Sequence, residues 1–231
     1  MLHISIKAEK LFDIFGFPVT NSLIATEIVL IAFFILAVWG KNHFIVRWIT
    51  HSLYSFFETI LHDKTALFFP FLGSLFLFII LSNWFGLLPG VESIFLKEGR
   101  GSIPLLRGTT ADLNVPLALA ILTFIVIQWS GIKYVGLRQY LKKFINLKNP
   151  MTVFVGFLEI ISEFSKIISF AFRLFGNIFA GEVLIAVVAF LIPILASLPF
   201  LALEIFVGFI QALVFSMLTA VFLSTAMAKE H

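Results

Sequence analysis

The sequence contains no cysteine and few charged residues. Because none of its 231 residues is a cysteine, disulfide bonds, thiol catalysis and cysteine-ligated metals are excluded. Only 13% of the residues are charged, whereas about a quarter are charged in an ordinary soluble domain. So small a share of polar residues cannot cover a fold that faces water, which excludes a soluble globular enzyme. The scarcity of charge equally excludes an intrinsically disordered chain.

Hydrophobic residues dominate the chain. They make up 60% of it, the mean hydropathy is +1.07, and the 30 phenylalanines suit a surface that faces lipid. A transmembrane helix needs about 20 apolar residues, and such segments occur at 22–40, 65–88, 112–132, 150–192 and 199–228. The sequence therefore predicts an all-α polytopic membrane protein with about five membrane-embedded helices. No segment is large and polar enough for a second domain, so we expect residues 1–231 to form a single membrane domain.

Residues 42–62 lie between the first two predicted spans and alternate between polar and apolar at helical spacing. The polar positions are His43, Arg47, Thr50, His51, Tyr54, Ser55, Glu58 and His62. This period gives a helix with one hydrated face, which is typical of a helix lying in the membrane interface. The alternative is an extension of the first span.

The charged loops predict the orientation. The segment 133–150 carries five basic residues and no acid, so the positive-inside rule places it in the cytoplasm. The loop 90–112 has three acids and three bases and suits the outer face. The tail 1–21 lacks a signal-peptide pattern, so we expect it to be retained, on the outside. Five spans then place the C-terminus in the cytoplasm, and a sixth would place it outside.

The last two apolar regions are longer than a bilayer requires. No proline occurs between Pro150, which suits a first helical turn with Asn149 as its N-cap, and Pro193. A continuous helix there would be roughly 64 Å long, against a hydrocarbon core of about 30 Å. Either this helix breaks, near Gly176, or it is tilted far beyond the usual range of about 0–40°. With 199–228, it predicts a long, steeply tilted helical hairpin.

Arg173 stands in apolar sequence in the middle of the first long segment. An arginine at bilayer depth costs about 2.5–3.5 kcal/mol on insertion scales, and it stays charged at physiological pH. It is therefore a candidate for a fixed positive charge on an ion path; the alternative is a structural arginine paired with a carboxylate. On the same helical stripe, Glu163 and Lys166 can form an ion pair. The stretch from Glu159 to Lys166 can also be interpreted as a solvated cytoplasmic helix end.

Two further acids lie in the apolar arms. Glu182 follows Arg173 by nine residues, which places it on the opposite side of a regular helix. Glu204 and Gln211 are seven residues apart and share a face, with Gly208 between them. Carboxyl groups in a low dielectric can exchange protons near neutral pH, so the two glutamates could relay protons. The alternative is two intramembrane acids whose polar groups are simply satisfied, one of them near a mouth.

The segment 172–182, Phe-Arg-Leu-Phe-Gly-Asn-Ile-Phe-Ala-Gly-Glu, closely resembles the signature of subunit a of the F-type ATP synthase. The segments 82–89, 110–120 and 211–219 resemble the same family in order and spacing, so that the resemblance covers nearly the whole chain. It implies a stator subunit beside a rotating ring of c subunits, each with one membrane-embedded carboxyl. Two offset half-channels in subunit a lead from opposite faces of the membrane to that ring.

The resemblance also implies residue roles. Arg173 would lie between the half-channels, ionise each ring carboxyl and prevent direct leakage. The resemblance implies half-channel or supporting roles for Glu182, Glu204, Gln211, Asn177 and Ser169. Asp112 is expected to cap the third span through Asn114, with a position at the half-channel mouth as the minor alternative. This chain has glutamate at both outer positions, where several family members have one histidine, so a sodium-coupled motor stays open.

The implied partners are the c-ring, the peripheral stalk formed by the b subunit, the rest of the F1F0 complex, membrane lipid and the transported protons. We expect no cofactor, no metal and no nucleic acid. We also expect no catalysis by this chain alone, because it carries no nucleotide-binding motif. The expected location is a bacterial plasma membrane, with an organelle as the alternative. A secondary transporter is the main rival function, although the inverted repeats common in transporters are not evident.

Overall fold

The computed structural model describes residues 9–14, 16–92, 95–98, 101–144, 149–191 and 197–228. Its α-helices are α1 (Asn21–Trp39), α2 (Phe44–Leu61), α3 (Thr65–Gly86), α4 (Asn114–Val135), α5 (Leu137–Phe144), α6 (Pro150–Leu191) and α7 (Ser197–Met227). Short strands flank them: β1 (Lys10–Ile14), β2 (Phe17–Thr20), β3 (Pro89–Glu92), β4 (Phe95–Glu98) and β5 (Gly101–Pro104). The description of the tail 1–21 begins at residue 9 and omits residue 15. The residues His3, Lys148, Pro193 and His231 also lie outside the described part of the chain.

Five helical segments are long and apolar enough to cross a membrane. They are Asn21–Trp39, Phe44–Gly86, Asn114–Val135, Met151–Phe190 and Leu198–Met227. The prediction of an all-α polytopic membrane protein is thus confirmed. Two small antiparallel hairpins, β1–β2 and β4–β5, were not predicted; they lie in the segments before α1 and before α4.

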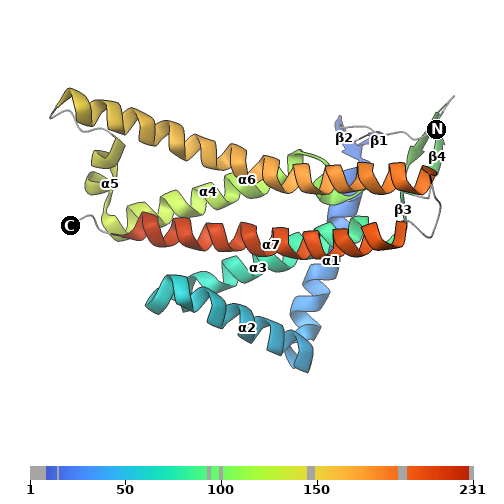
Figure 1. Ribbon diagram of the computed structural model, residues 1–231, viewed down its shortest axis with the longest axis horizontal. Helices are drawn as coiled ribbons and strands as arrows, with labels where there is room; N and C mark the ends of the chain where they lie inside the picture. Colours follow the sequence, from blue (N-terminus) through green and yellow to red (C-terminus); the bar gives the residue numbers. More distant parts are fainter. Residues whose placement is uncertain are drawn as a thin grey trace.

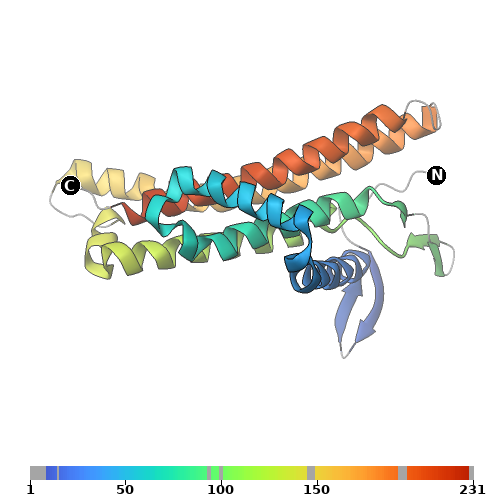
Figure 2. The same cartoon turned by 90° about the horizontal axis from the view of Figure 1, so that it is seen from below.

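The helices α3, α4, α6 and α7 pack alongside one another, with α3 on α7 and α4 on both α6 and α7. Figure 1 shows α6 and α7 as the long pair of this bundle, with α5 at one end and the segment β3–β4 at the other. The helix α1 runs across the long axis of this bundle, and Figure 2 therefore shows α1 almost end-on. Fully buried side chains at the centre include Leu72 and Ile79 of α3, Leu174 of α6 and Phe215 of α7.

The helix α2 is separate from α1. The 3₁₀ turn Gly40–Asn42 and the extended His43 divide them, so residues 42–62 do not extend the first helix. One side of α2 buries Leu53, Phe57 and Leu61 against its neighbours. Its other side exposes large apolar side chains and two histidines: Phe44, Ile45, Trp48, His43 and His51.

The long helix α6 is continuous over 42 residues, and it does not break at Gly176. At a rise of about 1.5 Å per residue, it is roughly 63 Å long. Of the two alternatives that the length allows, the unbroken helix is the one observed. At its first turn, the Thr152 hydroxyl accepts from the backbone N–H of Asn149 at 3.2 Å and donates to the Asn149 carbonyl at 2.7 Å. The Asn149 carbonyl also accepts from the backbone N–H of Val153 at 3.2 Å, as expected for the residue that precedes the helix.

Candidate functional site

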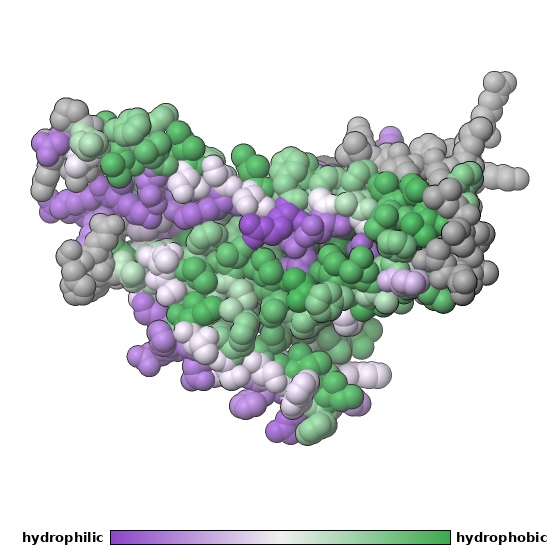
Figure 3. Space-filling model, in the orientation of Figure 1, coloured by the Kyte–Doolittle hydropathy of each residue, from purple (hydrophilic) through white to green (hydrophobic). Residues whose placement is uncertain are grey.

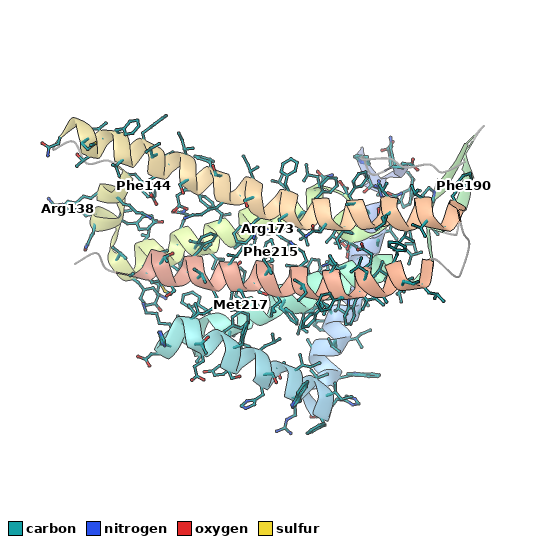
Figure 4. The ribbon with its side chains drawn as sticks, in the orientation of Figure 1. Arg138, Phe144, Arg173, Phe190, Phe215 and Met217 are labelled. Carbon is teal, nitrogen blue, oxygen red and sulfur yellow. The ribbon has the colours of Figure 1, made fainter. Side chains whose placement is uncertain are left out.

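Arg173 lies near the middle of α6 and is exposed on the surface of the chain. Figure 4 shows it beside the line along which α6 and α7 run together. Its guanidinium Nη2 donates to Ser169 Oγ, one helical turn earlier, at 3.5 Å. Among the described residues, no carboxylate lies within 4.0 Å of this guanidinium, so the alternative of an arginine paired with an acid is not observed. The positive charge of Arg173 therefore has no counter-ion among the described residues.

Asn177 and Gln211 join the two long helices one turn beyond Arg173. The Asn177 side-chain amide donates to Gln211 Oε1 at 2.6 Å. Asn177 is exposed, whereas Gln211 is only 4% exposed. The structure therefore brings together two residues that are 34 positions apart and that the sequence could only assign to the same region.

Glu204 of α7 is 6% exposed and lies directly against α6. A Cβ atom at Gly181 would overlap both oxygens of its carboxyl group. The carboxyl can occupy this position only because position 181 has no side chain. Glu204 thus lies against the residue that immediately precedes Glu182.

Glu182 points in another direction, towards the segment before α4. A Cβ atom at Gly108 would overlap its Oε1, and a Cβ at Gly86 would come within 4.0 Å of the same atom. The side chain therefore lies where the end of α3 meets the turn that precedes α4. This is the inner side of the bundle, opposite the exposed Arg173, as the nine-residue spacing predicts.

A group of buried polar residues continues from Glu204 into the bundle. Asn83 Nδ2 donates to the Gly208 carbonyl at 3.0 Å, and Thr110 Oγ1 donates to Asn83 Oδ1 at 3.0 Å. Trp84 Nε1 donates to the Ile205 carbonyl at 3.0 Å. These bonds fix α3 and the turn Thr109–Ala111 to the part of α7 that carries Glu204. Sequence reasoning missed Asn83 as a site residue, although an asparagine in an apolar span was a visible signal.

Asp112 is 5% exposed and links the starts of two helices. Its Oδ2 accepts from Ser22 Oγ of α1 at 2.8 Å. Its Oδ1 accepts from the backbone N–H of Asn114, the first residue of α4, at 3.3 Å. The second bond is the cap expected at this helix; the bond to α1 could not be read from the sequence.

A second polar cluster lies on the α5 side of Arg173. Lys166 Nζ is 2.7 Å from Glu163 Oε1, which confirms the predicted pair, and Gln128 Nε2 of α4 donates to Glu163 Oε2 at 2.9 Å. Glu163 is 5% exposed, so the interpretation of this stretch as a solvated helix end is wrong for that residue. Lys143 of α5 pairs with Glu159 at 2.6 Å.

Tyr140 of α5 completes this second cluster. Its hydroxyl donates to Gln128 Oε1 at 2.5 Å, and its ring fills the space that a side chain at Gly131 would need. Burial and the negative charges of Glu163 and Glu159 raise the pKa of Tyr140 to about 12. The phenol therefore stays protonated and remains a hydrogen-bond donor at physiological pH.

The second cluster and Arg173 form a polar stripe in an otherwise apolar surface, whereas the group around Asn83 is buried inside the bundle. Figure 3 shows hydrophilic surface extending from the α5 end towards the middle of α6 and α7. Described residues on this side include Lys143, Glu159, Lys166, Ser169 and Arg173. In the described part of the chain, no group of three or more histidines and acids could hold a metal ion. The arrangement places charged and hydrogen-bonding side chains along one side of α6.

Comparison with known proteins gives a consistent result. The model of the ATP synthase A chain family matches residues 19–224. The ATP synthase subunit a of Legionella pneumophila strain Paris is 33% identical over 224 residues, which cover 92% of this chain and 89% of that protein. The subunits a of strains Corby and Philadelphia 1 are 32% identical with the same coverage. The chain therefore belongs to the ATP synthase A chain family and is an integral membrane subunit of that ion-transporting complex.

Proposed function

We propose that the chain is the proton-translocating stator subunit of the membrane sector, and that Arg173 is the charge that separates two half-channels. The observation that carries this proposal is the exposure of Arg173 without a described carboxylate partner. A buried arginine with an acid beside it would be neutralised within the chain. An exposed, unpaired one is available to a carboxylate on another subunit, and its charge persists at physiological pH.

In this proposal, the ring of c subunits runs along the exposed face of α6 and α7. A ring carboxyl that approaches Arg173 is ionised, because a nearby positive charge favours the charged form. It takes up a proton again only after it has moved into one of the two half-channels. Ser169 positions the guanidinium, and Asn177 with Gln211 closes the space between the helices next to it.

The outer half-channel is assigned to Glu182 and Glu204, with Asp112 near its mouth. The support for this assignment is the buried polar group around Asn83, Thr110 and Asp112, which continues from these acids through the bundle. The half-channel on the other face is assigned to the polar stripe from α5 to Arg173. A charge that crosses 100 mV stores about 2.3 kcal/mol, and offset half-channels allow that energy to be used without a continuous pore.

The same proposal includes the arrangement in the membrane. Residues 1–231 form a single membrane domain, α2 lies in the interface, and α6 and α7 are steeply inclined relative to an upright α1. The basic helix α5 and the C-terminus face the cytoplasm of a bacterium, and the N-terminus lies outside. The chain binds the c-ring, the b subunit of the peripheral stalk and membrane lipid, and it has no catalytic activity alone.

The experiment compares Arg173→Ala with wild type in membrane vesicles that carry matched amounts of assembled complex. We expect ATP-driven proton pumping to be lost and the passive proton leak to rise after the soluble head is removed. Arg138→Ala, an exposed arginine of α5, is the matched control and should pump normally. Normal pumping by Arg173→Ala would overturn the proposal, because the charge would then not be needed to separate the half-channels. Pumping that requires sodium would identify the sodium-coupled form of the motor.

A further inference from the structure

The acids on the α5 side of Arg173 neutralise the cations around them. Glu163 accepts from Lys166 at 2.7 Å and lies 3.8 Å from Lys143, and Glu159 lies 2.6 Å from Lys143. Two acids therefore balance two bases in this cluster. Arg173 is then the one cation of the described part of α6 that has no carboxylate beside it.

Hydrogen bonds from neighbouring helices fix the position of the Glu163 carboxylate. Gln128 of α4 donates to its second oxygen at 2.9 Å, and Tyr140 of α5 donates in turn to Gln128. The helix α5 itself lies close to α6 at Gly156, where a Cβ atom would overlap the backbone of Phe144. A buried carboxylate with partners on both oxygens is fixed in direction, so it holds the ammonium of Lys166 in one place.

Lys166 is the cation closest to Arg173 along α6. Seven residues separate them, which is two helical turns and a rise of about 10 Å on the same side of the helix. If Lys166 were not neutralised, a carboxylate moving along this surface would meet two positive charges instead of one. It would be held in its ionised form before it reached Arg173 and after it left.

We propose that Glu163 is a positioning residue that neutralises Lys166 and so confines the unpaired positive charge of the stripe to Arg173. This inference rests on the proposed function, because it assumes that a carboxylate of another subunit passes along α6. It gives a specific role to Glu163, Gln128 and Tyr140, which the half-channel assignment includes only as part of the polar stripe.

The effect of replacing Lys166 or Glu163 depends on the polar and charged groups that face this pair. From α4 it is Gln128. From α5 they are Tyr140 and Lys143, and from α6 they are Glu159 and Arg173. The helix α7 contributes the Phe222 ring, 4.8 Å from Lys166 Nζ. The described part of α7 has one charged residue, Glu204, which lies farther along α7 from Lys166 than Gln211 does.

Removal of either charge should move the pH dependence of transport, and the two shifts should have opposite signs. With Glu163→Gln, the unbalanced Lys166 lowers the tendency of a nearby carboxyl to bind a proton, so uptake from the α5 side needs a lower pH. With Lys166→Gln, the unbalanced Glu163 has the opposite effect. A unit charge about 10 Å away, at an effective dielectric constant of about 20, corresponds to a shift of about one pH unit.

The test measures ATP-driven pumping by the assembled complex in inverted vesicles, with the pH of the medium varied on the α5 side. We expect the half-maximal pH to fall by about one unit in Glu163→Gln, to rise in Lys166→Gln, and to return to the wild-type value in the double variant. Glu58→Gln, an exposed acid of α2, is the matched control and should leave the profile unchanged.

The inference is overturned if the single variants change only the amplitude of pumping, or if both shift the profile in the same direction, because a loosened structure would do either. If Glu163→Gln does not assemble, the upward shift in Lys166→Gln supports the inference and an unshifted profile overturns it. Arg173→Ala is measured in parallel: pumping that survives in that variant refutes the proposed function itself, whatever the profiles of the other variants.

Discussion

The side-chain amide of Asn177 on α6 donates to Gln211 Oε1 on α7 at 2.6 Å, one turn beyond the exposed Arg173. This bond holds the two long helices together where the arginine lies. Truncation at Asn177→Ala leaves the buried Gln211 oxygen without this donor, which costs about 1–3 kcal/mol for such a group.

We therefore expect Asn177→Ala and Gln211→Ala each to lower the thermal stability of the purified complex. Because the two residues share one bond, the double variant should lose less than the sum of the single variants. Unfolding midpoints of all four proteins give the coupling. Strictly additive losses would show that the bond does not stabilise the hairpin.

Gly181→Ala should impair transport with little effect on folding. The new Cβ would occupy the space of the Glu204 carboxyl, which is the flexible end of its side chain and can swing away. Alanine also favours a helix over glycine by about 1 kcal/mol, so assembly should be preserved. We expect pumping to fall several-fold at an unchanged amount of complex.

The matched control is Gly73→Ala in α3, where the nearest atoms to a new Cβ belong to the Phe69 ring at 3.6 Å. This is an ordinary van der Waals contact, so pumping should remain normal. Equal pumping by both glycine variants would mean that the position of the Glu204 carboxyl against α6 does not matter for transport.

Tyr140 should make stability depend on pH in the alkaline range. Its pKa is about 12 in the folded chain, against 10.0 for the ordinary side chain. Between these values the folded state binds more protons than the unfolded state, so stability falls as pH rises. The contribution is fully present below pH 10 and is lost as pH rises through about 12.

Melting curves of wild type and Tyr140→Phe, recorded from pH 9 to pH 12, test this. We expect the wild type to lose stability more steeply than the variant above pH 10. Tyr54→Phe, on α2, serves as the control and should behave like wild type. Parallel curves for wild type and Tyr140→Phe would contradict the raised pKa.

Asn83→Ala should destabilise the bundle at the Glu204 side. The change removes the bond to the Gly208 carbonyl and the acceptor of Thr110, and it leaves both groups buried. We expect a loss of about 1–3 kcal/mol for each group left unsatisfied, seen as a lower unfolding midpoint. Asn42→Ala, at an exposed position in the turn after α1, should have no such effect. A midpoint unchanged in Asn83→Ala would refute the anchoring role.

The sequence by itself determined the membrane fold, because segments of about 20 apolar residues leave few alternatives to helices that cross a bilayer. It also determined features that depend on helical spacing alone. The Glu163–Lys166 pair and the opposite directions of Arg173 and Glu182 follow from separations of three and nine residues along one helix. The length of α6 was likewise visible, although two interpretations of it remained open.

Only the tertiary structure decided which distant residues meet. The bond from Asn177 to Gln211 and the position of Glu204 against Gly181 depend on how α6 and α7 are rotated about their axes. The burial of Glu163 required Gln128 of α4 and Tyr140 of α5, and each polar residue of that kind could equally have faced lipid or water. Spacing fixes neighbours within a helix, whereas contacts between helices follow from packing against small residues, which no single segment encodes.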